Sequence, residues 1–317
     1  SHYGKLPLNA SWGDPASHPR TIFVRTDLVS DFYDTVLPCL TKAFVLVTGD
    51  HDVTIPRQID SRYPKYLSHQ KWKALVNHRL VLHVFSENLD EPMVGVSGIP
   101  LGVNPGEFAG RDGDAMLSKI AGTTSISQRV VKVLNCDRQR DGSQFVDRRH
   151  VLELCDTSWK GLCVPQSNIS RSGFFKHVQR YPFILCVHGG GLDPSPKAWE
   201  ALMAGTIPIM QHYAGDDAYR ELPVVFVDNW AAETITEANL QSWLLALAPY
   251  FEDEDRRREV VRRLHSEYWW AKVENVLRTR GRTLTKRDAM SIEWRAPVPS
   301  ESCQYLNERG DCVPYKV

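Results

Sequence analysis

Residues 183–210 read FILCVHGGGLDPSPKAWEALMAGTIPIM, an order of apolar, glycine-rich and helical segments that is typical of one fold class. The apolar run 183–187 has the length and composition of a buried strand. Gly189, Gly190 and Gly191 follow, then a helical pattern over 197–204 and a second apolar run over 207–210. This strand–turn–helix–strand order predicts a parallel sheet in an α/β domain.

The glycine turn and the first turn of the helix have the properties of an anion-binding site. Glycines allow a ligand to approach the backbone closely, and a helix N-terminus offers free N–H groups and partial positive charge. Lys197 lies in the first helical turn, where a cation is unfavourable unless an anion is bound. Glu200 follows on the same helix face, where its carboxylate can accept hydrogen bonds from a ribose diol. The alternative is a turn without a ligand, in which Lys197 and Glu200 form a surface pair.

The rest of the chain repeats this alternation on both sides of a polar stretch. We predict further strands at 21–26, 43–48, 79–85, 94–103, 130–134 and 224–227. We predict helices at 30–37, 147–154, 171–179, 240–247 and 252–280. The stretch 104–128 is rich in Gly, Asp, Ser and Thr and is interpreted as a linker.

These elements predict two Rossmann-like lobes that face a cleft, with long C-terminal helices. The expected boundaries are an N-terminal α/β lobe at 1–115, a C-terminal lobe at 116–280 and a tail at 281–317 that packs back on the N-terminal lobe. Ligands in such sheets bind beyond the carboxyl ends of the strands.

Composition limits the classes of partner. The 317 residues are 42% hydrophobic and 24% charged, with 38 Lys and Arg against 38 Asp and Glu, so there is no basic field to attract nucleic acid. We expect no nucleic-acid partner and no transmembrane segment, since no apolar run approaches about 20 residues. The first residues show no signal-peptide pattern. The compartment stays open between the cytoplasm and the lumenal part of an anchored secretory-pathway enzyme.

The seven cysteines form no CxxC pair, so a zinc ribbon is not supported. Cys39, Cys136 and Cys186 lie in or beside apolar runs and are interpreted as small buried hydrophobes. Cys303 and Cys312 flank a polar turn and could close a small disulfide loop.

The run from Gly189 to Pro208 resembles the donor-binding segment of exostosin-like glycosyltransferases, which have the GT-B fold. The matching residues are Gly189, Gly191, Asp193, Lys197, Trp199, Glu200, Ala201, Leu202, Gly205, Ile207 and Pro208. The segment 222–230 also resembles the family, and 99–103 does so more loosely. The likeness covers about two thirds of the chain and is strong from 183 to 230.

The resemblance implies that Glu200 binds the donor ribose and that the residue at Lys197 neutralises the leaving diphosphate. The expected donor-binding set is His188, Gly189, Gly190, Gly191, Asp193, Lys197 and Glu200. His188 could contact phosphate or sugar, or serve a structural role. The family usually has Arg where this chain has Lys197, and one extra residue separates that position from Asp193. A lysine supplies a point charge where an arginine supplies a fork.

A second polar cluster follows two strands of the first lobe. Asp50, Asp52 and Glu87 are candidates for the general base that an inverting transferase needs. His51 and Asn88 are candidates for binding the acceptor. The alternatives are an Asx-type turn at 50–52 and a metal site, because Asp50-x-Asp52 has the form of the DxD motif of GT-A glycosyltransferases. A GT-A enzyme usually has a whole nucleotide-binding unit before that motif, which does not fit before Asp50.

The sequence therefore predicts a hexosyl- or pentosyltransferase of GT-B type that uses a nucleotide-sugar donor and a carbohydrate or other hydroxyl acceptor. No cofactor and no divalent metal are expected. Asp50, Asp52, Glu87 and Lys197 are the predicted catalytic residues. A metal-dependent GT-A-like transferase and a non-catalytic carbohydrate- or nucleotide-binding module remain as alternatives.

Overall fold

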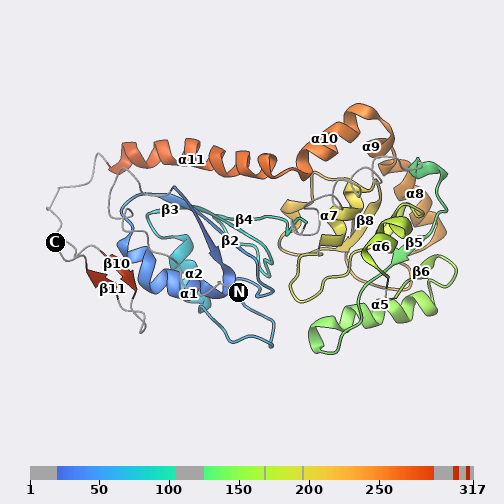
Figure 1. The fold of residues 1–317 in the computed structure, drawn as a ribbon, viewed down its shortest axis with the longest axis horizontal. Helices are drawn as coiled ribbons and strands as arrows, with labels where there is room; N and C mark the ends of the chain where they lie inside the picture. Colours follow the sequence, from blue (N-terminus) through green and yellow to red (C-terminus); the bar gives the residue numbers. More distant parts are fainter. Residues whose placement is uncertain are drawn as a thin grey trace.

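The computed structural model describes residues 20–103, 125–167, 169–194, 196–288, 303–306 and 312–314. Within these residues the chain forms two separate parallel sheets, each packed against helices (Figure 1). Strands β10 (Cys303–Leu306) and β11 (Cys312–Pro314) add a small antiparallel pair. The predicted α/β class with parallel sheets is confirmed.

The first sheet has its strands side by side in chain order, and all neighbours pair in parallel. Its strands are β1 (Thr21–Arg25), β2 (Phe44–Gly49), β3 (Val81–Ser86) and β4 (Val96–Gly98). Successive side chains of a strand point to opposite faces. In β2, Phe44 and Leu46 enter one apolar cluster and Val45 enters another. Both faces of this sheet are therefore covered, as the unbroken apolar run predicts.

One face of the first sheet packs against α2 (His69–Val76) and a helical run at 26–39 that contains α1 (Val29–Asp31). Helix α2 starts at Ser68, whose hydroxyl accepts a hydrogen bond from the amide three residues on, at 3.2 Å. Its Trp72 is fully buried in the same cluster as Phe44. The sequence patterns used above did not predict α2.

The second sheet has the strand order β6-β5-β7-β8-β9, again all parallel. Its strands are β5 (Val133–Asn135), β6 (Cys163–Pro165), β7 (Phe183–Leu185), β8 (Ile207–Gln211) and β9 (Val225–Val227). One face packs against α5 (Val146–Asp156) and α8 (Glu237–Leu247). The other packs against α6 (Arg171–Val178), α7 (Pro196–Met203) and α10 (Glu254–Leu264). The short α9 (Pro249–Glu252) joins α8 to α10.

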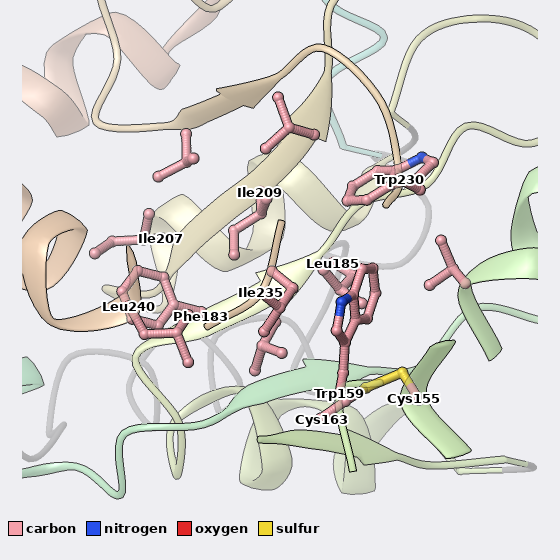
Figure 2. Packing of buried hydrophobic residues seen from close by; sticks show 14 of the residues in the cluster. Cys155, Trp159, Cys163, Phe183, Leu185, Ile207, Ile209, Trp230, Ile235 and Leu240 are labelled. Carbon is pink, nitrogen blue, oxygen red and sulfur yellow. A yellow bond between two sulfur atoms is a disulfide. The ribbon is translucent and has the colours of Figure 1, made fainter. Parts of the chain in front are cut away.

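The core on the α5 side is built around aromatic rings (Figure 2). Trp159 is fully buried, and its ring lies edge-on to that of Trp230, with centroids 6.4 Å apart. A disulfide between Cys155 and Cys163 joins the end of α5 to the start of β6 beside Trp159 (Figure 2). No sequence pattern predicted the pairing of these two cysteines.

The remaining cysteines agree only in part with the prediction. Cys186 is buried, whereas Cys39 and Cys136 are only half-buried. The side chains of Cys303 and Cys312 lie outside the described residues.

Helix α11 (Ser266–Asp288) extends from the second sheet's helices across to the first sheet (Figure 1). Near its start, the Trp269 ring packs on Trp199 of α7, with centroids 6.2 Å apart. Further along, Val273 is buried with residues of β2 and β3. Arg280 Nη1 donates a hydrogen bond to the Leu82 carbonyl of β3 at 2.9 Å. Helix α11 thus packs on the first sheet. The packing of the tail at 281–317 on the N-terminal lobe stays a prediction.

The expected strands and helices mostly recur within one to three residues of their predicted ends. The fourth strand is the main exception, because only Val96–Gly98 of the predicted stretch 94–103 is extended and paired. Gly95 just before it has a φ of 86°, a left-handed conformation that interrupts a strand. Strand β6 was not predicted. Most of the linker at 104–128 and most of the tail lie outside the described residues.

The packing of α11 on the first sheet can be tested at Val273. We expect Val273→Asp to lower the free energy of unfolding by about 3 kcal/mol, because it buries an unpaired charge where apolar surface was buried. Urea unfolding measures the change. The control is Leu245→Asp on α8, where the side chain is 82% exposed and the expected change is within about 0.5 kcal/mol. Equal effects of the two variants would contradict this packing.

Candidate functional site

Residues that follow the strands of the first sheet contact the glycine turn that follows β7. Asn88 Oδ1 accepts a hydrogen bond from the Asp193 amide at 2.9 Å, and Asn88 Nδ2 donates to the His51 carbonyl at 2.9 Å. The Leu101 amide donates to Asp193 Oδ2 at 3.2 Å. Residues after β2, β3 and β4 therefore meet the turn of the second sheet directly.

Arg62 adds a charged contact between the same two regions. Its Nη2 donates to the Gly190 carbonyl at 2.9 Å, to Asp52 Oδ2 at 3.2 Å and to Asp60 Oδ2 at 2.6 Å. Asp60 is nearly buried, whereas the Asp52 side chain is 48% exposed. The guanidinium thus joins a carboxylate of the first sheet to the backbone of the glycine turn.

Each glycine of the turn faces a side chain that leaves no room for a Cβ atom. A Cβ on Gly189 would lie 2.7 Å from Arg148 Nη2. On Gly190 it would overlap the Asp52 carboxylate, and on Gly191 the Asn88 amide. Close packing against protein side chains is therefore enough to explain all three glycines, with no need for a ligand.

Asp193, predicted to bind the donor, is buried and held by neighbours. Besides the Leu101 amide, the Tyr219 hydroxyl donates to its carboxylate, at 3.0 Å to Oδ2. Burial and the Asp193 charge raise the pKa of both Tyr219 and Tyr213 well above the usual value for tyrosine. In this structure Asp193 links the two sheets.

Lys197 lies in the first turn of α7, as predicted, but its partner is an aspartate from another element. Its ammonium contacts Oδ1 of Asp137, which follows β5. Burial lowers the pKa of Lys197, and the nearby Cys136 and Glu200 oppose this shift. Glu200 itself is only 1% exposed. The alternative of a surface pair between Lys197 and Glu200 is therefore wrong, although the two charges lie close to each other.

Two histidines predicted to bind substrate have protein partners. His51 Nδ1 accepts a hydrogen bond from the Val53 amide at 3.1 Å, and Nε2 lies 3.9 Å from Asp27 Oδ2. His188 Nε2 lies 3.4 Å from Asp147 Oδ2. Burial lowers the pKa of His188, the Asp147 charge raises it, and Arg148 lowers it further.

Asp50 and Glu87 form a unit at the carboxyl ends of β2 and β3. The Asp50 amide donates to Glu87 Oε2 at 2.9 Å, and Asp50 has a φ of 56°. Asn88 is also left-handed, with a φ of 50°. A positive φ at a residue other than glycine is uncommon. Such strain often marks a functional site.

Burial raises the pKa of Glu87 to about 8, and the charges of Asp193 and Asp50 act in the same direction. The hydrogen bond from the Asp50 amide opposes the shift. Near neutral pH, Glu87 is therefore mostly a neutral carboxylic acid.

Sequence reasoning missed the residues that support this site from other elements. Asp137 and Arg148 lie beneath the glycine turn, and Arg62 and Asp27 lie on the first-sheet side. These are charged residues in loops or on a helix, and no local spacing connects them to the turn. The guanidinium groups of Arg62 and Arg148 both lie over the ring of Phe145.

A large cavity of about 2180 Å³ lies elsewhere, between the first sheet, α7, α10 and α11. Its lining is mainly apolar and includes Phe23, Trp199 and Trp270, but none of the predicted carboxylates. Val103 and Ser125 both line it, and residues 104–124 between them lie outside the described part. No site is assigned to it.

Two kinds of feature, a metal-binding cluster and a membrane-spanning helix, are absent from the described residues. No group of three or more His, Cys, Asp or Glu side chains there is arranged to hold a metal ion. None of the helices in that part is both long and apolar enough to cross a bilayer.

Comparisons with known proteins found little similarity. No protein-family model matches the chain, and no curated protein matches it. Among solved structures, TarM is 8% identical with a TM-score of 0.44, over 81% of this chain and 54% of that one. The GtfA/B complex is 11% identical with a TM-score of 0.25, over 83% and 60%. The chain thus spans 54–60% of these proteins, and TM-scores below 0.5 carry no argument about its activity.

The contact between Gly191 and Asn88 can be tested by a double-mutant cycle. We expect Gly191→Ala to cost about 1–3 kcal/mol of stability, because the new methyl group displaces the Asn88 amide. In an Asn88→Ala background the same change should cost clearly less, because the overlapping atoms are gone. Chemical denaturation of the four proteins gives the coupling energy. Additive effects would mean that the two regions do not touch here.

The raised pKa of Glu87 predicts a pH-dependent stability. Between its ordinary pKa of 4.5 and about 8, the folded chain holds a proton that the unfolded chain has lost, so stability falls as pH rises. Glu87→Gln removes this loss. The stability gained by the variant should grow from pH 5 to pH 9, to at most about 5 kcal/mol. Melting temperatures at each pH measure it, with the exposed Glu254→Gln as control. A gain that does not change with pH would contradict the shift.

Proposed function

We propose that this chain is a glycosyltransferase of GT-B type that moves a sugar from a nucleotide-diphosphate sugar to a hydroxyl acceptor. The observation that carries the proposal is that residues of the first sheet contact the glycine turn of the second sheet. Asp52 and Asn88 of the first sheet lie against the glycine turn of the second, and Lys197 and Glu200 lie on the helix that follows. This arrangement supports two parts of the proposal. One is that two Rossmann-like lobes face a cleft, and the other is that residues 183–230 act like the exostosin-like segment that they resemble.

On the donor side, the free N–H groups at the start of α7 and the Lys197 ammonium would hold the diphosphate. They would stabilise the negative charge that develops on it as the bond to the sugar breaks. Glu200 would accept hydrogen bonds from the ribose diol. Because Asp52 and Asn88 fill the space over Gly190 and Gly191, a phosphate over these glycines requires the two lobes to separate or these side chains to rotate.

On the acceptor side, Asp52 is our proposed general base for an inverting reaction. It is half-exposed and lies at the glycine turn, so an acceptor hydroxyl can reach it. Glu87 is a poorer base near neutral pH because it retains its proton there. His51 has its Nδ1 lone pair occupied by the Val53 amide. Asp50 is the second candidate, and Asn88 is proposed to orient the acceptor.

A thermal-shift screen against UDP, GDP, CMP and dTDP sugars tests the donor site. We expect one nucleotide to raise the melting temperature and Glu200→Ala to abolish the shift. The control is Glu254→Ala, a helical glutamate on the surface, which should keep it. No shift with any of these nucleotides would remove the basis of the proposal.

Transfer activity tests the base. With the donor found in the screen, Asp52→Asn should lower kcat by about 10²-fold or more while donor binding is retained. Activity that survives this change would move the role to Asp50.

Two alternatives lead to different outcomes. A metal-dependent transferase built on Asp50-x-Asp52 would lose activity in EDTA, whereas the proposed enzyme would retain it. A non-catalytic binding module would give nucleotide binding in calorimetry without donor hydrolysis or transfer.

A further inference from the structure

Asp137 is a buried carboxylate at the carboxyl end of β5 that no sequence pattern singled out. Its side chain is 0% exposed, and burying such a charge is costly unless it is paired. Oδ1 contacts the Lys197 ammonium and lies 3.6 Å from Arg148 Nε. Its backbone amide donates to Asn135 Oδ1 at 3.1 Å. One carboxylate oxygen thus has two cations from two different helices as neighbours.

Arg148 fixes this carboxylate relative to the glycine turn. Its Nε donates to the His188 carbonyl at 3.0 Å and its Nη1 to the Arg138 carbonyl at 3.2 Å. The same guanidinium packs directly on Gly189. Because Arg148 is 8% exposed and bonded to backbone on both sides, it has little freedom to move. Asp137 is therefore tied to the turn through Arg148.

Lys197, in contrast to Arg148, has a flexible side chain, and its charge is disfavoured where it lies. A lysine side chain has several rotatable bonds and loses rotamer entropy when it is held in one position. Both burial and the N-terminal end of the helix dipole disfavour its charge. The nearby Cys136 and Glu200 oppose the lowering of the Lys197 pKa. The Asp137 carboxylate contacts the ammonium directly, and an adjacent negative charge favours the protonated amine.

We propose that Asp137 is a positioning residue that keeps the Lys197 ammonium charged and directed along the edge of the glycine turn. Arg148 and Lys197 lie on either side of the Asp137 carboxylate, and the buried Glu200 carboxylate is a further charged group that acts on Lys197. That the held ammonium faces a bound diphosphate rests on the function proposed above. The held ammonium also gives a lysine some of the fixed geometry that an arginine fork would supply.

The pH dependence of Lys197 acetylation tests the pairing without any donor. Acetic anhydride modifies only the neutral amine, and peptide mass spectrometry measures Lys197 separately from other lysines. In Asp137→Asn the midpoint should move to lower pH, equivalent to a roughly tenfold or greater increase in neutral amine at a fixed pH. The matched control is the exposed pair Asp34–Lys71, 2.8 Å apart. There Asp34→Asn should leave the Lys71 midpoint nearly unchanged.

A stability cycle supplies a second measurement in case Lys197 reacts too slowly to titrate. Lys197→Met leaves the Asp137 carboxylate buried beside Arg148 alone and should lower the melting temperature. Adding Asp137→Asn to that variant should recover part of the loss, whereas Asp137→Asn in the wild-type chain should lower stability. Additive effects in this cycle, or an unchanged Lys197 midpoint in folded Asp137→Asn, would overturn the proposal.

Inorganic pyrophosphate separates this inference from the proposed function. If Lys197 is the diphosphate ligand, pyrophosphate should slow its acetylation in the wild-type chain, and Asp137→Asn should lose that protection as pH rises. A shifted midpoint without any protection by pyrophosphate would keep Asp137 as the group that holds Lys197 and would count against the diphosphate site alone.

Discussion

The lack of side chains at three consecutive positions is the constraint on which this site depends. Gly189, Gly190 and Gly191 let Arg148 approach from below and Asp52 and Asn88 approach from the other sheet. A single methyl group at any of the three would overlap one of these partners. The glycines therefore set how closely the carboxyl ends of the two sheets come together. They also set how far the first-sheet carboxylates lie from the start of α7.

The carboxylates at this junction have different surroundings. Glu87 is buried beside other acids and keeps its proton near neutral pH, whereas Asp52 lies near solvent with Arg62 as its partner. Asp137 is fully buried but has two cations beside it. Pairs of acids whose surroundings separate their protonation are a common property of sites that perform acid–base chemistry. These differences between the carboxylates come from their burial and from the charges beside them, which residue type alone does not determine.

The sequence predicted the parts of this structure that local patterns encode. The apolar run before the glycines became β7, and the helix predicted at 197–204 became α7, which begins and ends one residue earlier. Helix α2 and strand β6 were missed. The partner of Lys197 was also missed. Asp137 is 60 residues away along the chain, and only the pairing of β5 with β7 brings it near the glycine turn.

Helix α11 links the two sheets a second time, by packing on β2 and β3, in addition to the chain that passes from β4 to β5. A motion of one sheet relative to the other would therefore have to move α11 or break its packing on the first sheet. In the same helix, the Trp269 ring packs on Trp199 of α7. Trp199 lies three residues after Pro196, where α7 begins. A rotation of the first sheet would therefore be transmitted through α11 to α7. The N-terminal end of α7 would respond to motion that begins about two helical turns along α11.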